Sequence, residues 1–205
     1  MIKAIVFDFG NVICFPQKPE IREEMARLAG LPFEKFNELD HKLRCEYDRG
    51  GFDGKGYYKS LLAEAGIFPD DKCLEKITKT DQDGWKNMNP GTIKLMEDIQ
   101  AAHITLGILS NMPYDFLAWG MENIPIFARA DAAVFSCDYH LIKPEPAIYE
   151  VLRKQLDCPY GDIVFFDDLE DNIAKARELG IEGIVWNGPD AAREELEKRF
   201  KIVLA

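Results

Sequence analysis

Short apolar runs recur along the chain, and stretches with helical spacing separate the later ones. These runs are rich in β-branched and aromatic side chains and cover Ala4–Phe7, Ile104–Leu109, Ala132–Phe135, Ile163–Phe166 and Gly183–Trp186. Such runs are typical of strands buried on both faces, which occur in parallel sheets covered by helices. The pattern therefore predicts an α/β fold, with a Rossmann-like parallel sheet as its core and helices flanking the sheet.

The expected helices show apolar residues at three- and four-residue spacing. They cover Thr92–Ala102, Pro146–Leu156, Asn172–Leu179 and Ala191–Phe200. Residues 16–88 differ, because they have helical spacing without a clear buried strand. We therefore expect a core domain of residues 1–15 and 89–205, interrupted after the first strand by a helical cap domain of residues 16–88.

Composition narrows the class of protein. The chain has 205 residues, is 47% hydrophobic and carries a formal net charge of −11. It can bury a sizeable core, and its acidic balance argues against nucleic acid or an anionic membrane surface as a partner. The five cysteines lack metal-type spacing, and we see neither a signal peptide nor a membrane span. We expect a cytoplasmic protein with reduced thiols, and the sequence predicts no particular oligomeric state.

Polar residues stand where the predicted strands end. They are Asp8 after the first strand, Ser110 and Asn111 after the second, Lys143 after the third, and Asp167 and Asp168 after the fourth. Ligands of parallel α/β folds bind beyond the carboxyl ends of the strands, so these side chains should share one site. Carboxylates suit Mg²⁺, a lysine neutralises phosphate oxygens, and hydroxyl and amide groups donate to them. The set predicts phosphoryl transfer.

The segments that carry these residues are VFDFGNV, LSN, KPEPAIY and FFDDLEDNIAKARELG, in that order. The ordered set resembles the four motifs of the haloacid-dehalogenase-like (HAD) hydrolase superfamily over about residues 1–15 and 90–187. The D-x-G-N-V start with FFDD-x-x-x-N is similar to a bacterial subgroup that includes α-D-glucose-1-phosphate phosphatase. The helical insertion lies where this family carries its cap.

The resemblance implies a phosphatase that acts on a small phosphorylated metabolite, such as a hexose 1-phosphate. Asp8 would be the nucleophile that forms an aspartyl-phosphate, and Lys143 would pair with Asp8 and with the phosphate. Ser110 and Asn111 would hold phosphate oxygens.

The resemblance also implies a Mg²⁺ cofactor. Its ligands would be Asp8, the backbone carbonyl of Gly10, and Asp168. Asp167 would orient this site, or would be the ligand itself if the register differs by one residue. Asn172 occupies a position where the family often has a further aspartate, and it would orient the metal ligands without binding the metal itself.

Gly10 departs from the usual phosphatase motif, which has an aspartate two residues after the nucleophile to move a proton. Three interpretations remain open. The chain is a phosphatase in which another group moves the proton or the leaving group needs little help; or a metal-independent 2-haloacid dehalogenase; or a catalytically weak binding or regulatory protein. Candidate replacement acids are His41, Glu46, Asp48, His140 and Glu145.

Other side chains of the insertion have two possible roles. Arg44, Tyr47 and Arg49 either contact the substrate or form a solvated helix face. The three tryptophans, Trp85, Trp119 and Trp186, are expected to pack in the core or the cap rather than against substrate.

Overall fold

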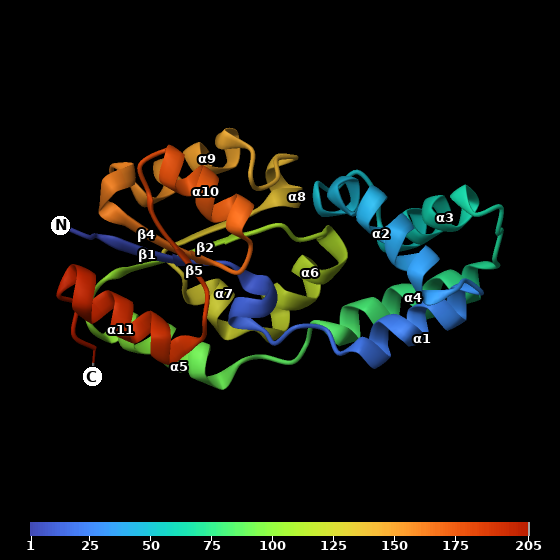
Figure 1. Cartoon of the computed structure of the whole chain (residues 1–205), viewed down its shortest axis with the longest axis horizontal. Coiled ribbons are helices and arrows are strands. Elements are labelled where there is room, and N and C mark those ends of the chain that lie inside the picture. Colours follow the sequence, from blue (N-terminus) through green and yellow to red (C-terminus); the bar gives the residue numbers. More distant parts are fainter. Residues whose placement is uncertain (205) are drawn as a thin grey trace.

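The computed structural model describes residues 1–204, and its sheet has five strands in the order β3-β2-β1-β4-β5 (Figure 1). They are β1 (Ala4–Phe7), β2 (Thr105–Ser110), β3 (Ala132–Phe135), β4 (Ile163–Asp167) and β5 (Glu182–Val185). Every pairing in the sheet is parallel. β1 is the central strand, and its Val6 lies between Gly107 of β2 and Phe165 of β4. The predicted Rossmann-like α/β core is confirmed.

Helices cover both faces of this sheet (Figure 1). They are α5 (Pro90–Ala101), α6 (Tyr114–Asn123), α7 (Pro125–Arg129), α8 (Ser136–Tyr139), α9 (Pro146–Leu156), α10 (Glu170–Glu178) and α11 (Pro189–Phe200). Four of them begin with a proline, which has no N–H to lose in a first turn. No helix within residues 1–204 is long and apolar enough to cross a membrane.

Alternating side chains of β1 supply the two apolar layers. Ala4 and Val6 pack with residues of α9 and α10 on one face, whereas Ile5 and Phe7 pack with residues of α5 and α11 on the other. All four side chains are fully buried. Because neither face meets water, the strand is apolar throughout, and its next residue, Asp8, is the first charge at the edge of the sheet.

Residues 16–88 contain a separate group of helices, labelled α1 (Pro19–Ala29), α2 (Phe33–Asp48), α3 (Gly54–Glu64) and α4 (Asp71–Gly84). They enclose an apolar cluster of their own, which includes Phe36, Tyr57 and Leu61. Asp53 and Asp70 start α3 and α4, where each carboxylate accepts a backbone hydrogen bond. The segment is helical, as the sequence predicted.

The chain enters and leaves this helical group through two segments that lie side by side. Phe15 N donates to Asn87 O at 2.8 Å, and Asn89 N donates to Ile13 O at 2.9 Å. This antiparallel pairing places both connections next to the turn that follows β1. The helical group therefore stands over the carboxyl ends of the strands (Figure 1).

Candidate active site

Asp8 lies at the carboxyl end of β1 and begins a tight turn, Phe9–Ile13. Its Oδ1 accepts a 2.6 Å hydrogen bond from Phe9 N and lies 2.8 Å from Lys143 Nζ. Burial raises the pKa of Asp8 to about 7; Lys143 opposes this rise and the charge of Asp167 adds to it. The carboxylate is fixed in position and poised between its two protonation states near neutral pH.

Lys143 lies in the loop before α9 and is 3% exposed. Its Nζ lies 2.8 Å from Asp8 Oδ1 and 2.6 Å from Asp167 Oδ2. Burial opposes the charge, but the two carboxylates together raise the pKa of Lys143, which therefore stays a cation. Asn111 holds the backbone of Lys143 from both sides, because its Oδ1 accepts from Lys143 N at 2.8 Å and its Nδ2 donates to Lys143 O at 3.1 Å.

Three carboxylates gather around this lysine. Asp8, Asp167 and Asp168 each offer an oxygen, and these oxygens all lie within 4.8 Å of one another. Asp167 is fully buried, and its two oxygens accept from Asn172 Nδ2 at 3.0 and 3.1 Å. Asp168 lines the cavity instead, and burial raises its pKa. Such a cluster of acidic oxygens around little positive charge is a site for a hard cation.

Asn11 is a member of the site that the sequence analysis missed. Its Nδ2 donates to Asp168 Oδ2 at 2.7 Å, while its buried Oδ1 has no hydrogen-bond partner within residues 1–204. Its φ of 59° is left-handed, a conformation that asparagine adopts more readily than most residues. The Gly-Asn pair after the nucleophile was the available signal, since it marks a turn that aims a short amide at the neighbouring strand end.

Gly10 occupies the position where the usual phosphatase motif has an acid. Its backbone is extended, with φ −61° and ψ 133°. A Cβ added to Gly10 would meet Trp85 Cζ3 at 3.6 Å, which is an ordinary contact. The indole of Trp85 thus faces Gly10, and its Nε1 donates to Asp81 Oδ1 at 3.2 Å.

The two predicted phosphate-binding residues of β2 are placed differently. Ser110 is 1% exposed, and its Oγ lies 3.4 Å from the carbonyl of Asn111. Asn111 lines the cavity, but both ends of its amide are engaged with Lys143. In this arrangement Asn111 positions Lys143, and contact of either residue with phosphate stays a prediction.

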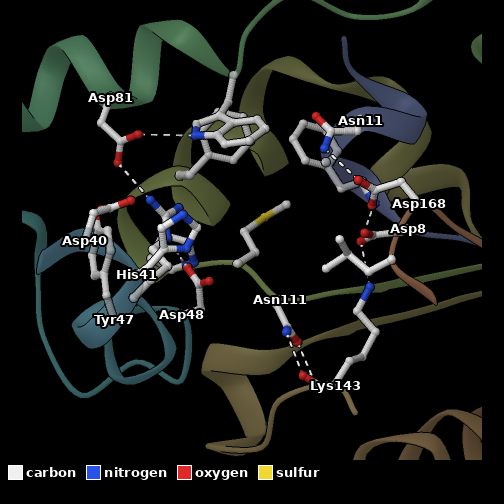
Figure 2. A pocket seen from close by; sticks show the side chains of 18 of the residues that line it. Asp8, Asn11, Asp40, His41, Tyr47, Asp48, Asp81, Asn111, Lys143 and Asp168 are labelled. Carbon is white, nitrogen blue, oxygen red and sulfur yellow. Dashed lines mark hydrogen bonds and ion pairs between the residues drawn. The ribbon is translucent and has the colours of Figure 1, made fainter. Parts of the chain in front are cut away.

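A cavity of about 340 Å³ separates this cluster from α2 and α4 of the helical group (Figure 2). The strand ends contribute Asp8, Gly10, Lys143 and Asp168 among others. The helical group contributes a second set of polar side chains: Arg22, Asp40, His41, Arg44, Tyr47, Asp48, Asp81, Gln82 and Trp85. Five of these lie on one face of α2, because their numbers are three, four or seven residues apart.

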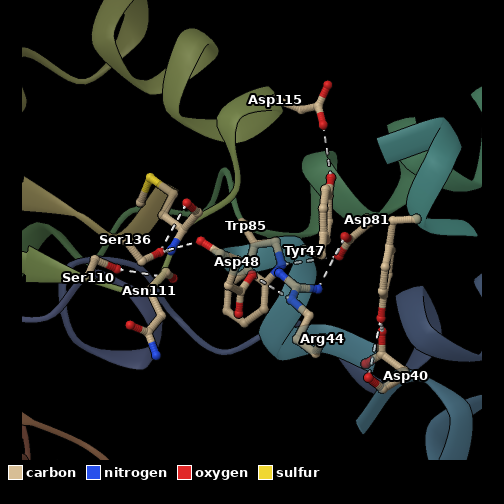
Figure 3. A network of polar contacts seen from close by, with 12 residues as sticks. Asp40, Arg44, Tyr47, Asp48, Asp81, Trp85, Ser110, Asn111, Asp115 and Ser136 are labelled. Atoms are coloured by element: carbon tan, nitrogen blue, oxygen red, sulfur yellow. Dashed lines mark hydrogen bonds and ion pairs between the residues drawn. The ribbon is translucent and has the colours of Figure 1, made fainter. Parts of the chain in front are cut away.

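The charged side chains on this second wall pair with one another (Figure 3). Arg44 Nε donates to Asp48 Oδ1 at 2.9 Å, and Arg44 Nη1 donates to Asp81 Oδ2 at 3.4 Å. Arg22 Nη2 donates to Asp40 Oδ2 at 2.9 Å. The wall presents neutralised pairs rather than free cations. The Arg22–Asp40 and Arg44–Asp81 pairs join different helices, so neither these pairings nor the role of Arg22, Asp40 and Asp81 followed from the sequence.

The candidate replacement acids separate into two groups. His41 and Asp48 line the cavity. Glu46, His140 and Glu145 do not; His140 and Glu145 contact Arg49 at the junction between α2 and the loop of Lys143. Because these three residues do not line the cavity, the structure gives no support to them as proton donors.

Arg44 and Tyr47 line the cavity and Arg49 does not, so contact of Arg44 and Tyr47 with substrate stays a prediction. Trp119 and Trp186 pack against the apolar core, as expected. Trp85 packs against the core too, as expected, but it also lines the cavity.

A family model described as haloacid dehalogenase-like hydrolase matches residues 2–180. The chain belongs to the haloacid dehalogenase-like hydrolases. Its resemblance to this superfamily is confirmed.

Among characterised relatives, bifunctional epoxide hydrolase 2 of Mus musculus is 38% identical over 68 residues, which are 33% of this chain. The match spans 12% of that relative's length. The phosphorylated carbohydrates phosphatase of Thermotoga maritima is 23% identical over 193 residues, which cover 89% of this chain and 84% of that protein. This HAD-like chain thus matches the phosphatase over most of both lengths.

Two solved structures show the same fold. An HAD family enzyme from Bacteroides thetaiotaomicron, in complex with magnesium and inorganic phosphate, superimposes with a TM-score of 0.72 at 18% identity, covering 91% of this chain and 95% of that one. The L-2-haloacid dehalogenase of Xanthobacter autotrophicus, with chloropropionic acid covalently bound, gives a TM-score of 0.67 at 18% identity, covering 97% and 84%. The HAD-like fold is thus shared with both a phosphate-binding enzyme and a dehalogenase.

Proposed function

We propose that this HAD-like hydrolase is a Mg²⁺-dependent phosphatase that acts on a small phosphorylated metabolite through an aspartyl-phosphate on Asp8. The observation that carries the proposal is the position of Asp8 on the floor of the cavity. There it is held 2.8 Å from the buried cation of Lys143 and next to the carboxylates of Asp167 and Asp168. A nucleophile, a cation and an acidic metal site around one point are what phosphoryl transfer needs.

The residues of the site fit Mg²⁺. Asp8 and Asp168 contribute oxygens to the same acidic cluster. The buried Oδ1 of Asn11, whose amide contacts Asp168, has no hydrogen-bond donor within the described residues. We propose Asp8, the Gly10 carbonyl and Asp168 as ligands, with Asp167 and Asn172 holding Lys143 and the cluster in place. When bound, the cation would offset the negative charge of the site and of the phosphate.

The roles of the chain's own side chains follow from their positions. Oδ1 of Asp8 is held by Phe9 N and Lys143, whereas Oδ2 has no hydrogen bond within residues 1–204 and is therefore the oxygen available to attack phosphorus. Lys143 would neutralise phosphate oxygens as they approach Asp8. Ser110 and Asn111, at the end of the adjacent strand, are proposed to contact the remaining oxygens.

The cavity wall on the helical side supports a neutral, hydroxyl-rich leaving group. Its two arginines, Arg22 and Arg44, are already paired with aspartates, so neither is free to bind a second phosphate or a carboxylate of the substrate. The paired ions and the Trp85 ring suit the hydroxyls and apolar faces of a sugar. A sugar phosphate such as a hexose 1-phosphate therefore fits best, in keeping with the name of the Thermotoga maritima relative.

A metal-independent 2-haloacid dehalogenase is the second candidate, favoured by the missing acid at Gly10 and by the shared fold. Two observations weigh against it. The acidic cluster of Asp8, Asp167 and Asp168 would repel the carboxylate of a haloacid. Arg22 and Arg44 are already engaged by aspartates, so neither is free to receive a halide.

We also propose that residues 16–88 act as a cap domain over a core of residues 1–15 and 89–205. The separate apolar cluster of α1–α4 and the paired connections beside Cys14 and Met88 support this division. The cap would exclude water from the cavity and select the leaving group.

Phosphate release from a chromogenic aryl phosphate and a panel of sugar phosphates, with Mg²⁺ and with EDTA, tests this function. We expect turnover that requires Mg²⁺ and is lost in Asp8→Asn. Halide release from 2-chloropropionate that persists in EDTA would establish the dehalogenase instead. Binding of Mg²⁺ and phosphate without turnover would establish the binding or regulatory interpretation.

A further inference from the structure

The phosphatase proposed above lacks a proton donor beside its nucleophile, because residue 10 is glycine. We propose that Asp48, at the end of cap helix α2, is the catalytic acid and base that replaces the missing aspartate. The inference rests on the proposed function, and it assigns the proton transfer to the cap rather than to the turn after β1.

The first support is the direction of the reaction. Phosphoryl transfer proceeds with attacking and leaving oxygens roughly in line, so the leaving oxygen points away from Asp8. Asp48 lines the same cavity as Asp8 but from its opposite, cap-side wall (Figure 2). An acid at Asp48 therefore faces the side of the phosphate from which the leaving group departs.

The other two cap carboxylates on this wall, Asp40 and Asp81, are engaged through both of their oxygens. Asp40 accepts from Arg22 at 2.9 Å through Oδ2 and from the Tyr57 hydroxyl at 2.6 Å through Oδ1. Asp81 accepts from Gln17, Trp85 and Arg44, again through both oxygens. Within residues 1–204, therefore, neither has an oxygen without a hydrogen-bond partner.

Asp48 differs because only one of its oxygens is engaged. Oδ1 accepts from Arg44 Nε at 2.9 Å, whereas Oδ2 has no hydrogen-bond partner among residues 1–204 (Figure 3). The side chain is 14% exposed, so the free oxygen is accessible from the cavity but largely shielded. Ser136 Oγ also donates to the Asp48 carbonyl, which ties this end of α2 to the core.

The surroundings of Asp48 hold its pKa above that of an ordinary aspartate. Burial raises its pKa and so do the charges of Asp81 and Asp40, while Arg44 opposes the rise. His41, two turns earlier on α2, also lines the cavity, but it is exposed, and no hydrogen bond from the described part of the chain fixes its ring. Asp48 is therefore the better held of the two groups.

The proposed steps balance. Asp8 Oδ2 attacks phosphorus, the bond from phosphorus to the leaving oxygen breaks, and the Asp48 carboxyl gives its proton to that oxygen, which releases an alcohol. The Asp48 carboxylate then takes a proton from water as the water attacks the phosphoryl group. The bond between Asp8 and phosphorus breaks, which leaves inorganic phosphate, a free Asp8 carboxylate and a protonated Asp48.

The test compares an alkyl phosphate, whose leaving group needs a proton, with p-nitrophenyl phosphate, whose leaving group does not. We expect Asp48→Asn to lower kcat/KM on the alkyl phosphate by about 10²–10³-fold. On p-nitrophenyl phosphate it should give a burst of about one nitrophenolate per enzyme and then slow turnover, because the second step lacks its base. Glu38→Gln, on the exposed face of α2, is the matched control and should behave like wild type.

A rescue separates catalysis from a structural role. Gly10→Asp restores an acid at the usual position, and its Cβ has room beside Trp85. We expect the double variant Gly10→Asp, Asp48→Asn to have a kcat/KM on the alkyl phosphate at least tenfold higher than that of Asp48→Asn alone. Asp48→Glu, which keeps a carboxylate beside Arg44, serves where Asp48→Asn fails to fold; it should retain the pH dependence of kcat at reduced rate.

Either of two results would overturn the role of Asp48. One is an Asp48→Asn protein that keeps the wild-type rates and pH profile on both substrates. The other is a folded Asp48→Asn protein that loses the same factor in kcat/KM on both substrates, shows no burst of nitrophenolate and is not rescued by Gly10→Asp. The proposed function fails separately, if wild type and Asp8→Asn release phosphate at the same rate.

Discussion

Lys143 Nζ lies 2.8 Å from Asp8 Oδ1, in a pocket where the lysine is almost completely buried. The same nitrogen lies 2.6 Å from Asp167 Oδ2. One cation thus balances part of the charge of three neighbouring carboxylates. Its removal leaves buried charges without a partner, and this is costly in a protein interior.

Lys143→Met should therefore impair both stability and activity. We expect a loss of about 3–5 kcal/mol in the free energy of unfolding, measured by urea denaturation at pH 8 without metal. Phosphatase activity should fall by more than about 10²-fold, since the phosphate loses its cation. Lys94→Met, which removes an exposed partner of Asp98, is the control and should change stability by less than about 1 kcal/mol. Equal effects of the two substitutions would contradict this account of Lys143.

The raised pKa of Asp8 predicts how stability depends on pH. Its pKa is about 7 in the folded protein, against 3.8 for an ordinary aspartate. Protonation of Asp8 therefore stabilises the fold below about pH 4, and this contribution is lost as pH rises through 7. Without metal, Asp8→Asn should have a higher Tm than wild type at pH 8. The increase should be about 2–4 °C for each kcal/mol gained in the free energy of unfolding.

Thermal unfolding of both proteins in EDTA between pH 4 and pH 8 provides the measurement. The difference in Tm should shrink toward zero at the acid end, where Asp8 is neutral in wild type as well. A Tm difference that is constant across this range would show that Asp8 has an ordinary pKa.

Metal affinity should depend on pH for the same reason. Mg²⁺ binds the ionised carboxylate, so below pH 7 it must displace the proton of Asp8. We expect the Kd measured by calorimetry to weaken up to about tenfold per pH unit below pH 7 and to level off above it. Asp168→Asn should weaken binding at every pH, whereas a Kd that does not vary with pH would argue against Asp8 as a ligand.

The contact between cap and core predicts an effect on substrate binding. Arg49 at the end of α2 donates to Glu145 at 2.7 and 3.0 Å, and Glu145 is two residues from Lys143. Arg49→Met should raise KM about 3–10-fold with a smaller change in kcat, because the cap would be held less firmly over the cavity. Arg153→Met, which breaks a similar Arg–Glu pair within α9, should leave both constants unchanged. The same increase in KM in both variants would mean that the contact between cap and core has no special role in substrate binding.

The fold followed from the sequence because its strands are buried on both faces. Continuous apolar runs at Ala4–Phe7 and Ile163–Phe166 left little choice other than a covered parallel sheet, and the structure places them side by side. Element ends were less certain. β2 begins and ends one residue later than expected, and α6 and α7 were not predicted, because Pro113, Gly120 and Pro125 interrupt their helical pattern.

The floor of the site followed from the position of polar residues at strand ends, whereas its cap wall did not. Asp8, Lys143 and Asp168 come together because parallel strands end at one edge. The engagement of Asn111 with Lys143 and the pairing of Arg44 with Asp81 depend on how loops and helices pack across long sequence distances. No spacing along the chain encodes those contacts.

The central claim is that Asp8 becomes phosphorylated during turnover. The most direct test is rapid acid quenching of enzyme mixed with a hexose 1-phosphate and Mg²⁺, followed by mass spectrometry of the peptide that contains Asp8. We predict that this peptide carries one phosphoryl group in wild type, and that the label is absent in EDTA and in Asp8→Asn. Phosphate release without any label on Asp8, or equal release by Asp8→Asn, would contradict the claim.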